Sequence, residues 1–302
     1  MIISKKHIFS YLTVSVLLFT SCNDSEKGND SIDGKKKVDK KLLDSDRSFN
    51  TTFDGKLFSV PSPIQTALLI KSTGLDFNED LLNSEANIST YIDDYKKALN
   101  LGVYGADLGY ATLYNQNGKS IQYLNAIESL ANDLGVAGTF DEDFLSKFEE
   151  NSNDQSSMLI MLTDAFRKVD NFLKENERKN TSSLILTGGW IESMHFVGNL
   201  YRESKDKQIL QRLGEQKQTL ITLIDILANY NDTGENDLLI ADLKSLKEHF
   251  DKIIITYEYV EPVTDKENQV TTFKNKMNIS ISQELEDEII SKINEIRNNI
   301  VD

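Results

Sequence analysis

The sequence has little of several residue types on which common folds and catalytic sites depend. Its 302 residues include one cysteine, three prolines, three histidines and one tryptophan. A single cysteine excludes an internal disulfide framework, so the folded part has to be stabilised by an apolar core. Three prolines leave most of the chain free of strong helix breakers. With so few histidines and no second thiol, carboxylates are the main groups left for acid–base or nucleophilic chemistry.

Metal and cofactor signatures are also missing. The chain has no His-Glu-x-x-His, no Gly-x-Ser-x-Gly and no Gly-x-x-x-x-Gly-Lys. Glu192 and His195 form one Glu-x-x-His pair, whereas a di-iron bundle needs two, and no Glu stands three residues before His249. The runs 76–80 and 229–234 begin like calcium loops but lack the closing glutamate. We therefore predict no metal and no cofactor, and we interpret His195 as a structural histidine.

The charge balance is acidic. Against 33 Lys and Arg stand 48 Asp and Glu, which gives a formal net charge of −15. Nucleic acid and anionic membrane surfaces would be repelled by such a chain, so nucleic acid is excluded as an expected partner. A cationic partner remains open, although acidity also serves solubility alone.

The only cysteine, Cys22, directly follows a short apolar segment. Lys5 and Lys6 precede this segment, which runs over residues 8–19 and is too short to span a bilayer as a stable helix. The arrangement resembles a bacterial lipoprotein signal peptide, with Phe19 where that family usually has Leu. The resemblance implies removal of residues 1–21 and acylation of Cys22, for example by palmitate. Ordinary cleavage with a free thiol and an uncleaved anchor helix are the alternatives.

Composition divides the rest of the chain into two parts. Residues 23–56 hold eight acids and eight bases with few large apolar side chains, so we predict a disordered tether over 22–56. A flexible chain of that length has an end-to-end distance of roughly 30 Å. Cleavage would remove two lysines and no acid, leaving 31 − 48 = −17, and all of that charge falls on 57–302. We expect 57–302 to be a single domain.

The apolar periodicity of that domain is helical nearly throughout. We predict an all-α fold, a multi-helical bundle or helical-hairpin array of about ten helices. The expected ranges are 63–70, 88–100, 101–115, 118–134, 141–150, 155–177, 182–202, 205–229, 235–259 and 283–300. A β-rich run near 253–281 leaves two alternatives. We favour a helix that continues to Tyr259 and then a loop, over a small β-hairpin around Pro262.

Apolar stripes indicate which helix faces are buried. In 155–177 the stripe is Met158, Met161, Leu162, Ala165, Val169 and Phe172. In 205–229 it is Leu213, Leu220, Leu223, Ile224 and Leu227. In the last helix it is Leu285, Ile289, Ile293, Ile296 and Ile300, with Ser280 or Ser282 as the N-cap.

Two helices carry glycines at packing positions. Gly102, Gly105 and Gly109 share one face of their helix, and Gly188 and Gly189 precede the only tryptophan. Glycine inside a helix costs about 1 kcal/mol relative to alanine, so another backbone or a ligand is expected close by. We favour two closely crossing helices. The alternative is a groove for a small polar or sugar-like ligand, and its candidate residues are Tyr104, Gly105, Asp107, Gly109, Tyr110, Trp190 and Glu192.

The leader, the composition and the helical domain together resemble the many lipoproteins of Bacteroidota without an assigned function. That resemblance implies a lipid anchor in the outer membrane, on the cell surface or on the periplasmic face. We expect a membrane-tethered, non-enzymatic protein with a binding or accessory role in the cell envelope. Its expected partners are the lipid bilayer, through acylated Cys22, and an envelope protein or a small polar ligand. The alternative is a carboxylate-based glycan hydrolase with a cleft near 104–107 and 190–192.

Overall fold

The computed structural model describes residues 49–53, 56–60, 63–265, 270–272 and 276–302. All of them lie within the unit formed by residues 35–302. The predicted signal peptide, Cys22 and most of the predicted tether lie outside the described residues.

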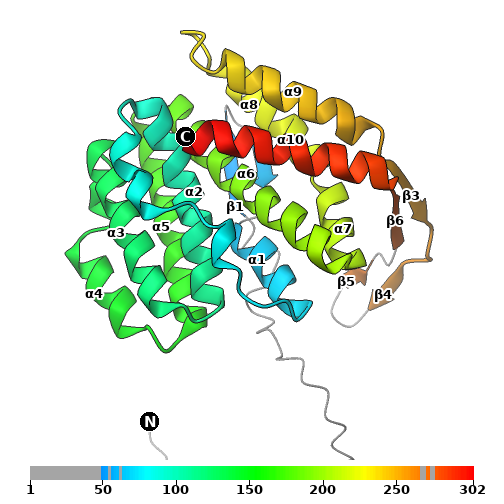
Figure 1. Cartoon of the computed structure of the whole chain (residues 1–302), viewed down its shortest axis with the longest axis horizontal. Coiled ribbons are helices and arrows are strands. Elements are labelled where there is room, and N and C mark those ends of the chain that lie inside the picture. Colours follow the sequence, from blue (N-terminus) through cyan, green and yellow to red (C-terminus); the bar gives the residue numbers. More distant parts are fainter. Residues whose placement is uncertain (1–48, 54–55, 61–62, 266–269, 273–275) are drawn as a thin grey trace, which may run out of the picture. The chain divides into compact units, whose positions relative to one another are not determined.

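The fold is all-α, as predicted, with ten α-helices within the described residues (Figure 1). They are α1 (Pro63–Ser72), α2 (Asp94–Leu113), α3 (Asn117–Asp133), α4 (Glu142–Glu150), α5 (Gln155–Glu175), α6 (Lys179–Ser204), α7 (Lys207–Glu215), α8 (Lys217–Asn229), α9 (Asp237–Asp251) and α10 (Gln283–Val301). Short 3-10 helices lie at Glu79–Leu81, Glu85–Thr90 and Ala137–Thr139. Among the described helices, none is both long enough and apolar enough to span a membrane.

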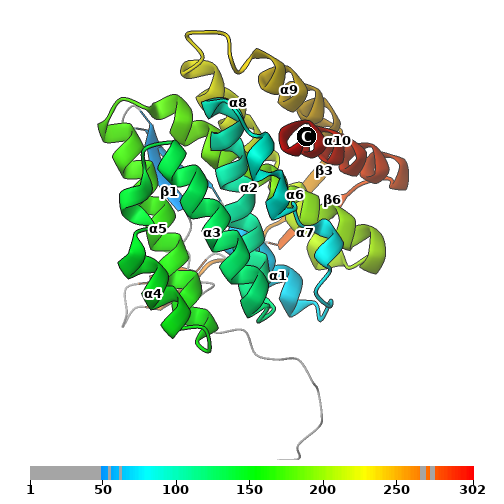
Figure 2. The ribbon, with the colours of Figure 1, turned by 60° about the vertical axis from the view of Figure 1, so that its left-hand side comes forward.

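Helices α2 and α6 form the centre of the core (Figure 2). Every residue of α2 from Ala98 to Leu113 is buried. Helix α2 also contacts α1, α3, α5 and α10, while α6 contacts α1, α5, α7, α8 and α10. A helix that packs against neighbours on all sides has no solvent-exposed polar face, so its sequence has little amphipathic pattern. The two glycine-bearing helices are therefore the most central elements of the fold.

Helix starts follow from side-chain caps. Asp93, Asp141, Asp154 and Asp206 each accept a hydrogen bond from a backbone N–H in the first turn of the helix that follows. Ser282 caps α10 by accepting from the backbone N–H of Leu285, so the second of the two predicted caps is the one used. Each such cap satisfies a donor that the helix itself leaves unpaired.

Three predicted helix boundaries are wrong. The predicted helices 88–100 and 101–115 form one α-helix, α2, which begins only at Asp94 after a 3-10 turn. The predicted helix 205–229 is broken at Gln216 into α7 and α8. The Oε1 atom of Gln216 accepts a hydrogen bond of 3.1 Å from the indole of Trp190, a tertiary contact that the local sequence does not reveal.

The third wrong boundary is at the end of α9, where the alternative of a small hairpin is correct. Helix α9 ends at Asp251, and strand β3 (Ile254–Glu258) pairs antiparallel with β6 (Lys276–Ser280). A second pair, β4 (Val263–Asp265) with β5 (Val270–Thr272), extends the hairpin. The β-branched residues that begin β3 favour a strand over another helical turn. We call the described residues between 254 and 280 the ribbon.

The predicted buried stripes are confirmed with one exception. All five apolar residues predicted for 205–229 and all five for α10 are buried. In α5, Met158, Leu162, Ala165 and Val169 are buried and Met161 is partly buried against the core, but Phe172 is exposed. Its place on the buried face is taken by Leu173, because the stripe of a 3.6-residue period drifts along a long helix.

Regular structure also begins earlier than the predicted domain start at residue 57. Strands β1 (Phe49–Phe53) and β2 (Lys56–Val60) pair antiparallel within and just after the predicted tether. The side chain of Phe53 is buried, and its ring lies 5.5 Å from the ring of Tyr230, centroid to centroid. Apolar contact with the helices thus orders a short hairpin for which local composition gives little signal.

Candidate functional site

The predicted close crossing of two helices is present at Gly102 of α2 and Gly188 of α6. A Cβ atom at Gly102 would collide with the backbone carbonyl oxygen of Ile185, and a Cβ atom at Gly188 would collide with that of Leu99. Both obstacles are backbone, which cannot move aside as a side chain can. These two glycines therefore allow α2 and α6 to approach more closely than any other residue type would.

The other glycines of α2 lie in the core as well. A Cβ atom at Gly105 would collide with the ring of Phe166 from α5, and Gly109 is buried. The smooth face of α2 is thus covered partly by α6 and partly by an aromatic ring. The open groove predicted as the alternative is not seen at these positions.

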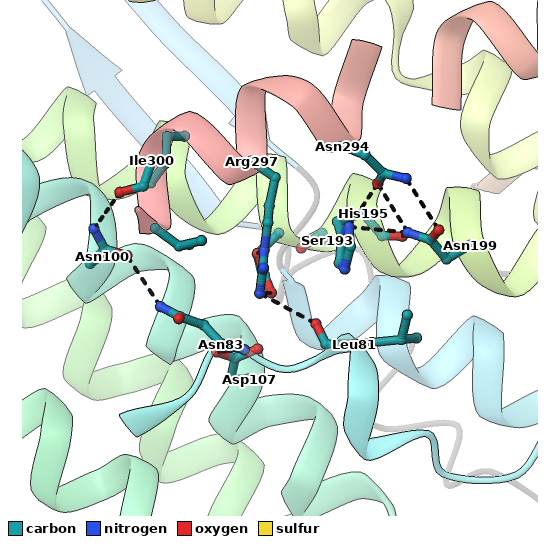
Figure 3. A network of polar contacts seen from close by, with 12 residues as sticks. Leu81, Asn83, Asn100, Asp107, Ser193, His195, Asn199, Asn294, Arg297 and Ile300 are labelled. Carbon is teal, nitrogen blue, oxygen red and sulfur yellow. Dashed lines mark hydrogen bonds and ion pairs between the residues drawn. The ribbon is translucent and has the colours of Figure 1, made fainter. Parts of the chain in front are cut away.

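Beyond the glycine crossing, three charged side chains from three different helices lie together, and Figure 3 labels two of them, Asp107 and Arg297. Asp107 comes from α2, Glu192 from α6 and Arg297 from α10. The Nε and Nη2 atoms of Arg297 each donate a hydrogen bond of 3.0 Å to Glu192, one to each carboxylate oxygen. The exposed fraction is 0% for Asp107 and Glu192, and 12% for the Arg297 side chain. We call these three residues the charged triad.

Asn83 connects the charged triad to its surroundings. Its backbone N–H donates to Oδ2 of Asp107 at 3.3 Å, and its carbonyl oxygen accepts from the hydroxyl of Tyr123 at 2.9 Å. Its side-chain amide donates to the hydroxyl of Tyr91 at 2.9 Å and to Oδ1 of Asn100 at 3.3 Å. One buried asparagine therefore joins the segment before α2 to α2 and α3.

The same network binds the end of α10. Asn100 donates a hydrogen bond of 3.0 Å to the carbonyl oxygen of Ile300, and Tyr91 donates one of 3.2 Å to that of Val301. Lys96 adds a hydrogen bond of 2.7 Å to the carbonyl oxygen of Asn299. The last carbonyls of a helix have no partner within the helix. Side chains that come from outside α10 satisfy them here.

His195 is bound by two asparagines next to the charged triad. Its Nδ1 lies 2.8 Å from Oδ1 of Asn294, and Asn199 donates to that same oxygen at 3.0 Å. Burial lowers the pKa of His195, so the imidazole is neutral at neutral pH. His195 is therefore a hydrogen-bonded helix histidine, as predicted. No group of three or more potential metal ligands is found in the described part of the chain.

Burial also sets the protonation of the carboxyl and phenol groups in this region. It raises the pKa of Asp107 well above the ordinary value of 3.8, and the adjacent Glu192 carboxylate raises it further. Burial likewise raises the pKa values of the hydroxyls of Tyr91, Tyr104 and Tyr123, which stay neutral. These three hydroxyls therefore add no ionised group beside Asp107, Glu192 and Arg297.

The remaining predicted ligand-binding residues are buried and hydrogen-bonded within the protein. The hydroxyl of Tyr104 donates to the carbonyl oxygen of Ser84 at 2.9 Å. The hydroxyl of Tyr110 accepts from the backbone N–H of Asn78 at 3.1 Å. Trp190 donates to Gln216, which also marks the break between α7 and α8. The structure therefore brings Asp107 and Glu192 together, whereas Tyr104, Tyr110 and Trp190 serve packing. A ligand-binding role for these residues stays a prediction.

A surface cavity lies elsewhere, where the ribbon meets the start of α10. Its volume is about 580 Å³, and its lining includes Lys252, Ile254, Ser280, Glu284 and Glu288. It shares no lining residue with the charged triad. The two converging carboxyls therefore do not face this cavity.

Sequence reasoning missed Asn83, Asn100 and Arg297. A usable signal existed for Arg297, because it stands at i+4 from Ile293 and directly after Ile296, within the apolar stripe of α10. A charged residue on a buried stripe is usually paired. Asn83 gave no such signal, since an asparagine between helices reads as an ordinary loop residue.

Comparisons with known proteins found no relative of this chain. No family model, no curated protein and no solved structure matches the chain. The function has to be argued from the sequence and the geometry.

Proposed function

We propose that this protein is a membrane-tethered lipoprotein with a non-enzymatic binding or accessory role in the cell envelope. The observation that carries the proposal is the position of Cys22, the only cysteine, directly after a lysine-led apolar segment. Acylation at this residue would attach the helical domain to the outer membrane through the residues that follow Cys22.

The state of the two converging carboxyls supports a binding role over hydrolysis. A glycosidase needs two carboxyl groups that reach the substrate from a cleft. Here both oxygens of Glu192 are occupied by Arg297, and neither Glu192 nor Asp107 is exposed. The charged triad is accordingly assigned to joining three helices.

The exposed apolar side chains indicate where a partner would bind. Of the eight large apolar side chains that are exposed among the described residues, five lie on the ribbon. They are Ile254, Tyr257, Tyr259, Val263 and Val270. In the described part of the chain, β3 pairs with β6 alone, so its other edge has no strand partner. An exposed edge with apolar side chains is the geometry by which a sheet accepts an added strand.

We therefore propose that the ribbon binds an extended segment of another envelope protein. A protein partner fits the charge better than the bilayer itself, because the net charge of −15 opposes contact with anionic lipid headgroups. The lipid anchor and the ribbon would then have separate tasks. The anchor sets the location, and the ribbon selects the partner.

Lipidation is tested by metabolic labelling with a palmitate analogue. The wild-type protein should carry the label and sediment with membranes, whereas Cys22→Ala should lose both properties. Ser25→Ala is the matched control and should behave like the wild type. Equal labelling of the Cys22→Ala variant would contradict the anchor.

Partner binding is tested by a photocrosslinking amino acid placed in the lipidated protein. One variant carries it at Tyr257, which is 70% exposed, and the control carries it at Leu238, which is 82% exposed. Leu238 lies in the first turn of α9, a helix about 20 Å long, and Tyr257 lies in β3, beyond the other end of that helix. We expect one envelope protein to be crosslinked through an extended segment from position 257 and not from 238. The same products from both positions, or none from 257, would refute binding at the ribbon.

A further inference from the structure

The charged triad is not balanced in charge. Arg297 is the only cation within the described residues that hydrogen-bonds to either carboxyl. Two of its hydrogen bonds go to Glu192, and a third, of 3.4 Å, goes to the carbonyl oxygen of Leu81. Asp107 receives one hydrogen bond, from the backbone N–H of Asn83 at 3.3 Å. Two ionised carboxylates beside one guanidinium would leave an uncompensated charge in the core, which is among the costliest arrangements in a protein.

The groups around this pair do not supply the missing positive charge. They are Tyr104 of α2, His195 of α6, Tyr123 of α3 and Tyr91 of the segment before α2. The pKa values of the tyrosines are raised, and that of the histidine is lowered, so all four are neutral at neutral pH. Charge balance therefore requires a proton on one of the two carboxyls.

The geometry indicates which carboxyl holds it. Oδ1 of Asp107 is buried and accepts no hydrogen bond within the described residues, although Asp107 lies against Glu192. A proton on this oxygen turns it from an unsatisfied acceptor into a donor to the Glu192 carboxylate. Glu192 has to stay ionised because it holds Arg297 at both oxygens. Burial and the Glu192 charge both raise the pKa of Asp107, in agreement with this assignment.

The proton has a mechanical consequence for α10. Arg297 attaches α10 to Glu192 of α6, and one turn later the carbonyl oxygens of Ile300 and Val301 are held by Asn100 and Tyr91. Asn83 touches both of those holding side chains and also Asp107. The C-terminal half of α10 is thus joined to α2 and α6 through one continuous network that contains the Asp107 carboxyl.

We propose that Asp107 is protonated in the native protein, donates a hydrogen bond to the Glu192 carboxylate, and in this form locks the C-terminal half of α10 onto α2 and α6. The lock weakens as pH rises. This inference is independent of the lipid anchor and of the ribbon.

The direction of this pH dependence follows from proton linkage. When the segment opens, Asp107 returns to its ordinary value of 3.8 and releases its proton, so the closed state binds more protons than the open state. The contribution of Asp107 is fully present below that value and is lost as pH rises towards the raised pKa of the closed state. Each pH unit within this window should increase the opening constant about tenfold.

The test is amide hydrogen exchange of the full chain, followed over Ile293–Val301 between about pH 5 and about pH 7. Asp107→Asn is the isosteric variant, because its amide donates to Glu192 without titrating. After correction for the intrinsic exchange rate, protection in the wild type should fall relative to Asp107→Asn by about tenfold per pH unit. The first half of α10, Leu285–Ile290, is the internal reference. Parallel protection in the two proteins at every pH would overturn the proposal.

A second measurement uses the wild type alone, so it remains decisive even if the variant does not fold. Infrared spectroscopy at neutral pH should show the carbonyl stretch of one buried protonated carboxylic acid. Exposed carboxyl groups are ionised at that pH and do not contribute to this band. Absence of the band in the folded wild type would overturn the proposal.

Discussion

Removal of the Arg297 side-chain charge is the most informative single perturbation of this fold. Arg297→Met keeps much of the apolar stem but deletes the guanidinium that makes two 3.0 Å hydrogen bonds to Glu192. The Glu192 carboxylate, 0% exposed, is then left without a cation. Breaking a buried ion pair from one side costs about 3–5 kcal/mol, a large part of a typical total stability of about 5–15 kcal/mol.

The assay is equilibrium unfolding in urea, followed by circular dichroism. With a slope of about 2–3 kcal/mol per molar urea, the unfolding midpoint should fall by about 1–2 M. The matched control is Arg202→Met, which removes a more exposed arginine of α6 that also contacts α10. Its Nε lies 3.9 Å from Asp287, and its Nη2 donates a hydrogen bond of 3.0 Å to Oγ of Ser291. An exposed pair contributes about 0–1 kcal/mol, so this midpoint should barely move.

Acid should partly rescue Arg297→Met, since two neutral carboxylic acids need no cation. The loss of stability should therefore be smaller at about pH 5 than at about pH 8. If Arg297→Met lowered the midpoint no more than Arg202→Met does, the buried ion pair would not be a major source of stability and the reasoning would be refuted.

Three further variants test the same core by urea unfolding. Gly102→Ala should lower the free energy of unfolding by about 1–3 kcal/mol or more, because the new Cβ meets a backbone carbonyl. Its control, Gly118→Ala, has open space around the new Cβ and should be neutral or slightly stabilising. Equal effects of the two substitutions would refute the close crossing. Asn100→Ala should lower the free energy of unfolding by about 1–3 kcal/mol, because it removes a hydrogen bond to the carbonyl oxygen of Ile300. An unchanged unfolding midpoint would mean that water replaces the amide. Glu192→Gln should lower the free energy of unfolding less than Arg297→Met does, because Asp107 can release its proton and pair with the guanidinium. A larger loss of stability in Glu192→Gln would contradict a protonated Asp107.

Amphipathic helices were predictable because their burial is one-sided. The apolar stripe of α10 repeats every three to four residues, and all five residues predicted from it are buried. The centre of the bundle was harder to read. Helix α2 is buried on all sides from Ala98 to Leu113, so its sequence shows no face, and the prediction divided it into two helices.

The candidate site was predicted in part. Asp107 and Glu192 were named together because each stands near a glycine-bearing helix face, and the structure does bring them together. Their partner Arg297 lies 105 residues beyond Glu192, and nothing local to either residue specifies that pairing. Asn83 also resembled an ordinary loop residue until the fold showed its hydrogen bonds to Asp107, Tyr91, Asn100 and Tyr123.

The sequence by itself determined the helical class, the buried stripes, the need for close packing at Gly102 and Gly188, and the lipoprotein-like leader, because periodicity, glycine spacing and short motifs are local properties. Only the tertiary structure decided that α9 gives way to the ribbon, that Gln216 breaks a helix, and that two carboxyls lie beside one guanidinium in the core. Those outcomes depend on contacts between residues far apart in the chain, whose energies outweigh local preference. The protonation of Asp107 belongs to this second group, since burial and a neighbouring charge exist only once the chain has folded.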